Sequence, residues 1–279
     1  MSRRGIRAAK FIEQGILLDG LHVRTNQLVD AGQTLSIAIG DTIEAVQNSK
    51  TIPIAGALDI LYEDDDLIVI NKQAGVGTHP SPKHREDTLG NYVMHHFRTT
   101  NQQCLVHPVS RLDWDTTGLI VYAKNAHVQD MLQEALHTDA FIREYVALCS
   151  GHLEALQGSV DAPIGLSERT WDVLAEGEGG KPARTHYRLL ETFELNDQPV
   201  SLVRLRLETG RTHQIRIHMK HLGHPLIGDA EYENPSELIS RPALHSAHIA
   251  LDHPITHARL TFDAPMPADM QSLCPQNGR

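Results

Sequence analysis

Residues 110–118 read Ser110-Arg111-Leu112-Asp113-Trp114-Asp115-Thr116-Thr117-Gly118, and the apolar segment 119–123 follows them directly. The apolar segment is rich in β-branched and aromatic residues and has the length of a buried strand. The polar stretch before it has the Asp, Thr and Gly content of a turn. A turn that leads into a buried strand is held rigidly but stays open to solvent on one side, which suits a reactive group.

The segments that follow place this turn in a central sheet. Residues 125–137 have the apolar spacing of an amphipathic helix, and residues 141–149 read as a strand. A strand, a helix and a second strand in close succession tie the turn that contains Asp113 to a sheet. The turn alone does not establish a function, because Asp and Thr side chains in turns commonly bond nearby backbone amides.

The composition is that of an ordinary globular protein. The chain has 279 residues, 41% of them hydrophobic, and no apolar run approaches the roughly 18 residues that span a membrane. The basic N-terminus lacks the apolar block of a secretory signal, so we expect a cytoplasmic protein without a membrane partner. The net charge of -10 argues mildly against a nucleic-acid partner but does not exclude a local basic surface. The three widely spaced cysteines indicate neither zinc nor a disulfide framework.

Residues 1–50 read as a small module of their own. Its start is basic, with Arg3, Arg4, Arg7 and Lys10, and residues 8–14 read as a short helix. Strands are expected at 16–18 and 21–23 around an Asp-Gly turn, and a second pair at 28–29 and 35–39. A linker at 48–57 precedes the larger domain, so we divide the chain into 1–50 and 51–279.

The larger domain has further strands and helices. Strands are predicted at 59–63, 67–72, 185–190, 202–208, 244–251 and 258–262. A helix capped by Asp87 or Thr88 runs to residue 97, and a second helix capped by Thr212 runs to residue 222. We expect Gln214 and Arg216 to lie away from the apolar stripe of the second helix. The glycine-rich residues 165–181 read as a mobile loop.

Two groups of residues raise the question of a metal. The Asp triplet at 64–66 lacks the glycine spacing and further oxygen ligands of a calcium loop, so we interpret it as a solvated hairpin tip. His213, His218, His221 and His224 lack an HExxH motif or a nearby cysteine to complete a zinc site. We predict that the protein binds no metal.

Three blocks of sequence occur together in a recognisable order. They are residues 62–72 (YEDDDLIVINK) with Gly75 and Val76, residues 107–119 (HPVSRLDWDTTGL), and residues 210–218 (GRTHQIRIH) with residues 222–229 (LGHPLIGD). This combination resembles the RluA-type pseudouridine synthases, which isomerise uridine to pseudouridine in structured RNA. The resemblance covers roughly residues 57–265, and residues 1–50 resemble the S4-like RNA-binding extension of many members.

The resemblance implies an α+β fold with a mixed, mostly antiparallel central sheet flanked by helices. It implies that Asp113 is the catalytic carboxylate, that Arg216 pairs with it, and that Tyr145 stacks on the uracil. It matches Arg111 to the residue that displaces the target base. Thr117, Arg211, His213 and Gln214 are further expected substrate contacts. Ser110 and Trp114 depart from the family pattern, where histidine and a basic residue are frequent.

The implied reaction needs no redox change and no group donor, so we expect no cofactor. RNA is the expected partner, with ribosomal RNA favoured over transfer RNA, and a monomer is expected. The alternative is a non-catalytic RNA-binding or ribosome assembly factor on the same fold. A glycoside hydrolase using Asp113 and Asp115 is disfavoured because side chains two apart on a turn do not flank a sugar. An RNA methyltransferase is disfavoured because no glycine-rich nucleotide-binding turn is present.

Overall fold

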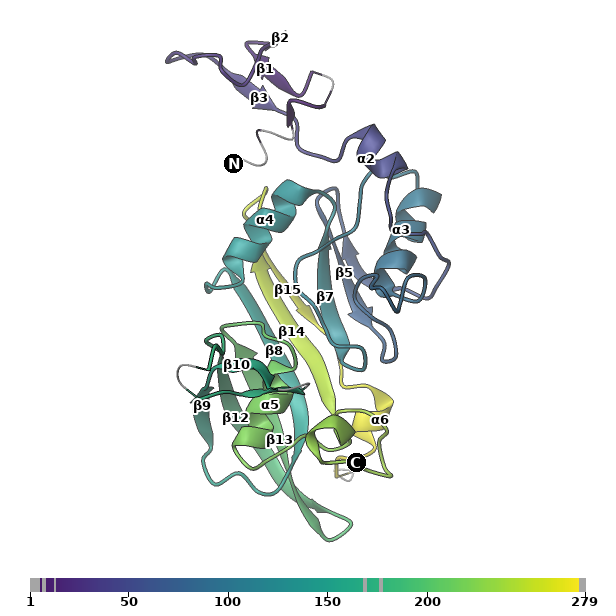
Figure 1. The fold of residues 1–279 in the computed structure, drawn as a ribbon, viewed down its shortest axis with the longest axis vertical. Coiled ribbons are helices and arrows are strands. Elements are labelled where there is room, and N and C mark those ends of the chain that lie inside the picture. Colours follow the sequence, from purple (N-terminus) through teal and green to yellow (C-terminus); the bar gives the residue numbers. More distant parts are fainter. Residues whose placement is uncertain (1–5, 7–8, 13, 168–169, 176–177, 276–279) are drawn as a thin grey trace. The chain divides into compact units, whose positions relative to one another are not determined.

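The computed structural model describes residues 6, 9–12, 14–167, 170–175 and 178–275 (Figure 1). The chain divides into two compact units. The first unit consists of Met1–Val69, Gly77–Arg111 and Val121–Glu134. The second unit consists of Ile70–Val76, Leu112–Ile120 and Ala135–Arg279. Among the described residues, no helix combines the length and the apolar character needed to cross a membrane.

The first unit begins with a small antiparallel sheet. Its strands are β1 (Ile16–Leu18), β2 (Leu21–His22) and β3 (Leu35–Ile37), in the order β2-β1-β3. The predicted hairpin around Asp19 and Gly20 is confirmed, since Leu18 pairs with Leu21. The predicted strand at 28–29 is wrong, because these residues form no regular structure and are exposed. Arg3, Arg4, Arg7 and part of the predicted helix at 8–14 lie outside the described residues.

Among its described residues, the rest of the first unit consists of four hydrogen-bonded strands or parts of strands and three helices or parts of helices. Its elements are α2 (Ile43–Gln47), β4 (Asp59–Glu63), the start of β5 (Leu67–Lys72), α3 (Leu89–Thr99), β6 (His107–Pro108), the end of β7 (Thr117–Ala123) and most of α4 (Ala126–Ala135). The strand order is β4-β5-β7, with β6 on β7. Thr88 is the N-cap of α3, as the sequence allowed, and Asn91 completes a capping box with it. The similarity of residues 1–50 to an S4-like module, and the domain boundary after them, stay predictions.

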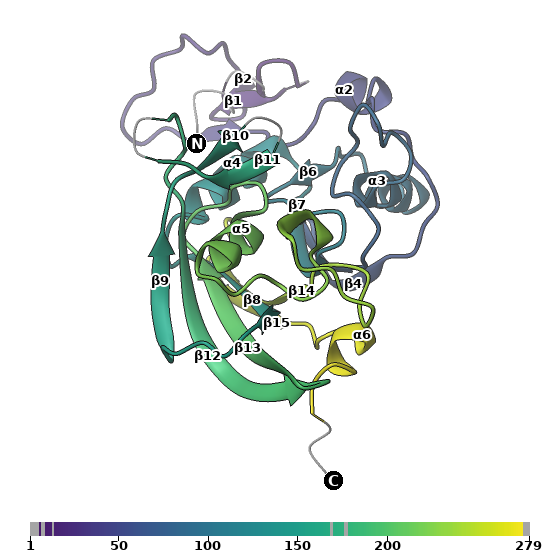
Figure 2. The same ribbon diagram turned by 60° about the horizontal axis from the view of Figure 1, so that its bottom comes forward.

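The second unit contains most of the strands (Figure 2). Their order is β7, β14 (Leu244–Asp252), β8 (Phe141–Ser150), β13 (Gln198–Leu207), β12 (Arg184–Leu195) and β9 (Gln157–Asp161), with β15 (Arg259–Asp263) on β14. β14 pairs with β7 in parallel, and the other pairs in this series are antiparallel. The predicted mixed, mostly antiparallel α+β fold is confirmed.

Short elements complete the second unit. They are β10 (Ile164–Ser167), β11 (Thr170–Val173), α5 (Gln214–His221), the 3-10 helix η1 (Ala230–Tyr232) and α6 (Ala268–Gln271). The expected loop at 165–181 is partly wrong, because Leu166 pairs with Trp171 in the hairpin of β10 and β11. Residues 168–169 and 176–177 lie outside the described residues.

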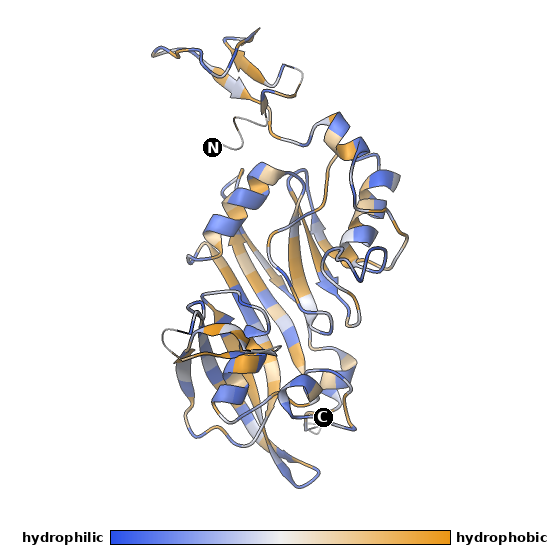
Figure 3. Ribbon diagram, viewed as in Figure 1, coloured by the Kyte–Doolittle hydropathy of each residue, from blue (hydrophilic) through white to orange (hydrophobic). Residues whose placement is uncertain are grey.

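Apolar side chains fix α5 and α6 in the second unit. Ile217 of α5 is buried in a cluster with Ile164, Ala183 and Tyr232. Met270 of α6 is fully buried in a second cluster, which includes Leu148 of β8 and Val200 of β13. Figure 3 shows many apolar residues along the central strands, with polar residues on the helices, in the connecting segments and on parts of the strands. Both helices are thus held on the strands by hydrophobic packing.

The backbone of β7 comes very close to the backbone of β14 near the start of β7. Every residue of β7 is buried, as predicted from its apolar sequence. Gly118 of β7 has φ +105°, and a Cβ at this position would lie 2.2 Å from the carbonyl oxygen of Ser246 in β14. Only glycine allows both this backbone conformation and this approach of two strands.

We therefore expect Gly118→Ala to lower the free energy of unfolding by about 3 kcal/mol or more, because β7 must move away from β14. Gly223→Ala is the matched control, since Gly223 also has a positive φ (+84°) but no neighbour within 4 Å of its added Cβ. That control should cost only about 1–2 kcal/mol. Urea denaturation measures both values, and equal losses would contradict the role assigned to the close approach.

Candidate active site

The polar stretch before β7 forms a tight turn at residues 113–116, called here the 113–116 turn. The Thr116 amide donates to the Asp113 carbonyl at 3.2 Å, and Asp113 itself is half-buried. Directly after the turn, Thr117 and Gly118 pair in parallel with His245 and Ser246 of β14. The turn is therefore anchored at its C-terminal end by two strands, while its first residue reaches solvent.

Asp113 faces a pocket of about 250 Å³. The pocket is lined by the 113–116 turn, by His213 and Arg216 at the start of α5, and by residues around η1, including Asp229 and Glu231. Segments that are about 100 residues apart in the sequence thus meet at one concave site, as the resemblance implied for Asp113 and Arg216.

Arg216 is held by two carboxylates on the far side of this pocket. Its Nε and Nη2 donate to the two carboxylate oxygens of Asp229, each at 2.7 Å, and Nη2 also donates to Glu231 at 2.8 Å. Its guanidinium lies over the Tyr232 ring, 4.8 Å from the centroid. Burial lowers the pKa of Arg216, but the hydrogen bonds to Asp229 and Glu231 and the charge of Asp113 outweigh it and raise the pKa.

The direct ion-pair partners of Arg216 therefore differ from the expected one. Its bidentate partner is Asp229, and Asp113 acts on it as a nearby charge. The expectation that Arg216 would lie away from the buried side of α5 is also wrong, since Arg216 is 7% exposed and Gln214 is 2% exposed. A buried guanidinium needs a paired carboxylate, and Asp229, which is 1% exposed, supplies it.

Tyr145 lies on β8, opposite Ser246 of β14 and Leu205 of β13. The side chain is 4% exposed. Burial raises the pKa of its phenol, and the negative charge of Asp113 raises it further. Tyr145 is therefore an uncharged aromatic group within electrostatic range of Asp113. Its stacking on a uracil stays a prediction.

The other predicted substrate contacts differ in their surroundings. His213 lines the pocket in a left-handed conformation (φ 54°), with Nδ1 3.0 Å from the Tyr232 hydroxyl. It is also the N-cap of α5, so the predicted cap at Thr212 is wrong by one residue. Arg211 is half-buried and donates through Nε to the carbonyl of Pro182. Both remain proposed substrate contacts.

Two of the predicted contacts are used inside the protein. Gln214 donates to the Arg184 carbonyl and the Thr185 hydroxyl and accepts from the Arg211 amide, so it joins α5 to β12. The Thr117 hydroxyl lies 2.8 Å from Nδ1 of His245 in β14. Neither side chain lines the pocket of Asp113. Arg111 is exposed and belongs to the first unit, and its role in base displacement stays a prediction.

Three of the four clustered histidines also have protein partners. His213 lies by Tyr232, His218 lies between the Thr185 hydroxyl and the Ala162 carbonyl, and His224 lies 2.9 Å from the Ser150 carbonyl. These contacts match the interpretation of the histidines as structural residues. The absence of a metal stays a prediction.

Lys72, a buried residue that contacts the 113–116 turn, was not predicted from the sequence to belong to the site. The amine of Lys72, at the end of β5, donates to the carbonyls of Gln73, Val76 and Trp114 at 2.8–2.9 Å. The side chain is only 1% exposed. Its three hydrogen bonds use every donor of an ammonium group, and they tie the residues after β5 to the 113–116 turn. In the sequence, Lys72 ends a predicted strand and the first of the three blocks that carry the resemblance.

Lys72 is also electrostatically connected to Asp113. Burial lowers the pKa of Lys72 to about 7, the charges of Asp115 and Asp113 oppose this decrease, and Arg241 adds to it. Asp113 therefore interacts with the charges of Lys72 and Arg216 and with the phenol of Tyr145. Strongly shifted groups around one carboxylate are a feature of catalytic sites.

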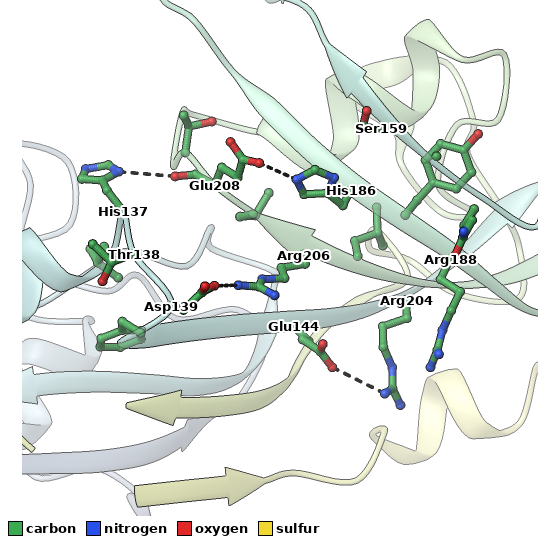
Figure 4. A pocket seen from close by; sticks show the side chains of 18 residues that line it. His137, Thr138, Asp139, Glu144, Ser159, His186, Arg188, Arg204, Arg206 and Glu208 are labelled. Carbon is green, nitrogen blue, oxygen red and sulfur yellow. Dashed lines mark hydrogen bonds and ion pairs between the residues drawn. The ribbon is translucent and has the colours of Figure 1, made fainter. Parts of the chain in front are cut away.

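A larger hollow, of about 1180 Å³, lies elsewhere in the second unit (Figure 4). Ion pairs between neighbouring strands and loops line it: Arg204 with Glu144 at 3.4 Å, Arg206 with Asp139 at 2.5 Å, and His186 with Glu208 at 2.6 Å. None of the eight predicted site residues is among the described residues that line it. Because no predicted site residue is among the described residues of this hollow, the smaller pocket at Asp113 is the better candidate for the chemistry.

Comparison with known proteins identifies the family of this chain. The family model for RNA pseudouridylate synthase matches residues 66–221, which include Asp113, Tyr145 and Arg216. The chain belongs to this family, and it is an RNA-modifying isomerase that converts uridine to pseudouridine.

Individual relatives extend over nearly the whole chain. The uncharacterized RNA pseudouridine synthase YhcT of Bacillus subtilis is 38% identical over 261 residues, covering 94% of this chain and 84% of that protein. Ribosomal large subunit pseudouridine synthase D of Escherichia coli K12 is 37% identical over 277 residues, covering 94% and 82%. The structure of human RNA pseudouridylate synthase domain containing 1 is similar with a TM-score of 0.60 and 27% identity, covering 75% of this chain and 83% of that one.

The lowered pKa of Lys72 predicts a specific pH dependence of stability. The pKa is about 7 in the folded protein and 10.5 ordinarily, so between these values the unfolded chain binds more protons than the folded one. The free energy of unfolding of the wild type should therefore rise relative to Lys72→Met from pH 7 to pH 9, by about 1 kcal/mol per pH unit.

Denaturation in urea at several pH values measures this difference. Lys181→Met, which removes an exposed lysine of the same unit, is the control and should stay parallel to the wild type. A difference between wild type and Lys72→Met that is constant or falls with pH would contradict the buried, charge-disfavouring site described for Lys72.

Proposed function

We propose that Asp113 is the catalytic carboxylate with which this enzyme isomerises specific uridines in structured RNA. One observation carries the proposal: Asp113 opens onto the pocket lined by His213 and Arg216, and its charge reaches Arg216, Tyr145 and Lys72. Asp113 is thus a half-buried carboxylate that opens onto the pocket, near two basic groups and a buried aromatic ring.

The reaction requires few chemical groups. The N1–C1′ bond of the uridine breaks, the uracil turns while it stays bound, a C5–C1′ bond forms with loss of the C5 proton, and N1 gains a proton. Atoms are conserved apart from this proton exchange, so no donor or oxidant takes part. Asp113 can add covalently to the sugar or base, or it can remove the C2′ proton. Both routes need the carboxylate close to the ribose, and the half-buried position of Asp113 allows this.

The target uridine has to leave its stack to reach Asp113. Extrusion of a base costs roughly a few kcal/mol, which stacking and side-chain insertion offset. We assign stacking to Tyr145 and insertion to Arg111. Arg211 and His213, at the approach to α5, supply further contacts to the RNA. Arg216 orders the pocket through Asp229 and Glu231 and adds a positive charge opposite Asp113.

Ribosomal RNA is the proposed substrate. Several relatives are named ribosomal large subunit pseudouridine synthase D, among them the proteins of Vibrio parahaemolyticus and Escherichia coli. The N-terminal residues 1–50 are proposed to bind RNA as an S4-like module. Action as a monomer in the cytoplasm, without metal or cofactor, stays a prediction from the sequence.

The proposal predicts that Asp113→Asn loses turnover at least about 100-fold, because the amide can neither attack nor accept a proton. The variant should still fold and bind RNA, since Asp113 is half-buried and amide and carboxylate are similar in size. Release of tritium from RNA labelled at C5 of uridine measures turnover, and filter binding measures RNA affinity. Arg216→Met is less informative, because it leaves Asp229 buried without its partner and costs about 3–5 kcal/mol of stability.

Asp263→Asn, at an exposed carboxylate on β15, is the matched control and should keep wild-type turnover. Wild-type turnover in Asp113→Asn would exclude the proposed role of Asp113. RNA binding by the wild type without any tritium release would favour the alternative function, a non-catalytic RNA-binding or assembly factor.

A further inference from the structure

Arg241 connects the 113–116 turn to the C-terminal helix α6. It is 5% exposed and precedes β14. Its Nε and Nη2 donate to the two carboxylate oxygens of Asp269 in α6, at 2.8 and 2.9 Å. Its Nη1 donates to the carbonyl of Asp115 at 3.3 Å and to those of Pro242 and Leu244 at 3.1 and 3.3 Å. One guanidinium thus joins three separate segments of the second unit.

We propose that Arg241, oriented by Asp269, is a positioning residue that fixes the 113–116 turn and so aims Asp113 at the substrate. The inference rests on the proposed function of Asp113. Neither residue lines the Asp113 pocket with its side chain, so both act through the backbone of the turn.

The arrangement around the turn supports a positioning role. Lys72 donates to the Trp114 carbonyl, and Arg241 donates to the next carbonyl along the chain, that of Asp115. The two donors come from positions 42 residues before and 126 residues after the carbonyls that they contact. With these contacts, consecutive peptide groups of the turn are each bound from the interior, and the remaining side of the turn, with Asp113, stays open.

Asp269 controls how Arg241 points. A guanidinium that binds a carboxylate through two parallel hydrogen bonds has a fixed plane, so its third nitrogen has a fixed direction as well. The carboxylate belongs to α6, which is held by Met270 in the core. Burial raises the pKa of Asp269, but the hydrogen bonds and charge of Arg241 outweigh it and lower the pKa. The pair is therefore a charged clamp between a packed helix and the turn.

Loss of this clamp should affect rate more than binding. A displacement of a reacting group by about 1 Å can cost about 100-fold in rate. Arg241 contacts only one carbonyl of the turn, while Lys72 and the pairing of β7 with β14 remain, so a partial loss is expected. We expect kcat to fall about 10- to 100-fold in Asp269→Asn and in Arg241→Lys. KM and the Kd for RNA should stay within about twofold, because the groups that touch RNA are unchanged.

The experiment uses the full-length protein and RNA labelled at C5 of uridine. Tritium release gives kcat and KM, filter binding gives Kd, and thermal unfolding shows that each variant is folded at the assay temperature. Asp252→Asn and Arg259→Lys form the matched control, because these two residues make an exposed ion pair at 2.9 Å at the opposite end of β14. Asp269→Glu, which keeps the carboxylate, should recover part of the lost kcat. If Arg241→Lys fails to fold, Asp269→Asn still tests the inference, because it leaves residue 241 as arginine and removes only the charge that orients it.

A wild-type kcat in folded Asp269→Asn would overturn the inference. So would a loss of kcat that matches the unfolded fraction, since that would show a structural role alone. These results are distinct from failure of the proposed function, which would appear as normal turnover in Asp113→Asn. If Asp113→Asn is inactive and Asp269→Asn is fully active, only the positioning role of Arg241 fails.

Discussion

A lysine and an arginine, both buried, donate hydrogen bonds to consecutive carbonyls of the turn that presents Asp113. Lys72 binds the Trp114 carbonyl and Arg241 binds the Asp115 carbonyl. Buried basic groups are costly unless they are hydrogen-bonded, and here the backbone of the turn supplies acceptors for both. The same hydrogen bonds thus offset the cost of burying Lys72 and Arg241 and hold the backbone of the turn in place. Gly118 then lets the chain pass from the turn into β7 at close distance to β14.

The same residues create the electrostatic surroundings of Asp113. Arg216 is fixed by Asp229 and Glu231, and it acts on Asp113 as a charge across the pocket. The absence of a direct hydrogen bond between Arg216 and Asp113, two residues that the structure describes, favours catalysis, because a carboxylate in a bidentate pair has few lone pairs left for a substrate. Asp229 is the bidentate partner of Arg216 instead, and the side chain of Asp113 lines the pocket. Tyr145, uncharged and buried on β8, completes the group.

Sequence patterns predicted many of the strands, the mixed sheet and the proximity of Asp113 to Arg216, since these depend on local apolar spacing and on a recognisable set of motifs. They failed where long-range contacts decide the structure. The partner of Arg216 could not be identified, because Asp229 lies on a separate short element 13 residues away. Residues 165–181 were assigned to a loop for their glycine content, although Trp171 pairs with Leu166 in a hairpin. Helix α6 has four residues, too few to show a helical period, and Asp269 was therefore missed.

The most direct test is a crystal structure of Asp113→Asn bound to an RNA that contains the target uridine. We expect the uridine to be extruded into the pocket, with its ribose against residue 113 and its base near Tyr145, while Arg216 stays on Asp229. We also expect Lys72 and Arg241 to keep their contacts with the carbonyls of residues 114 and 115. A uridine bound elsewhere, for example in the hollow lined by Arg204 and Arg206, would contradict the assignment of the active site to Asp113.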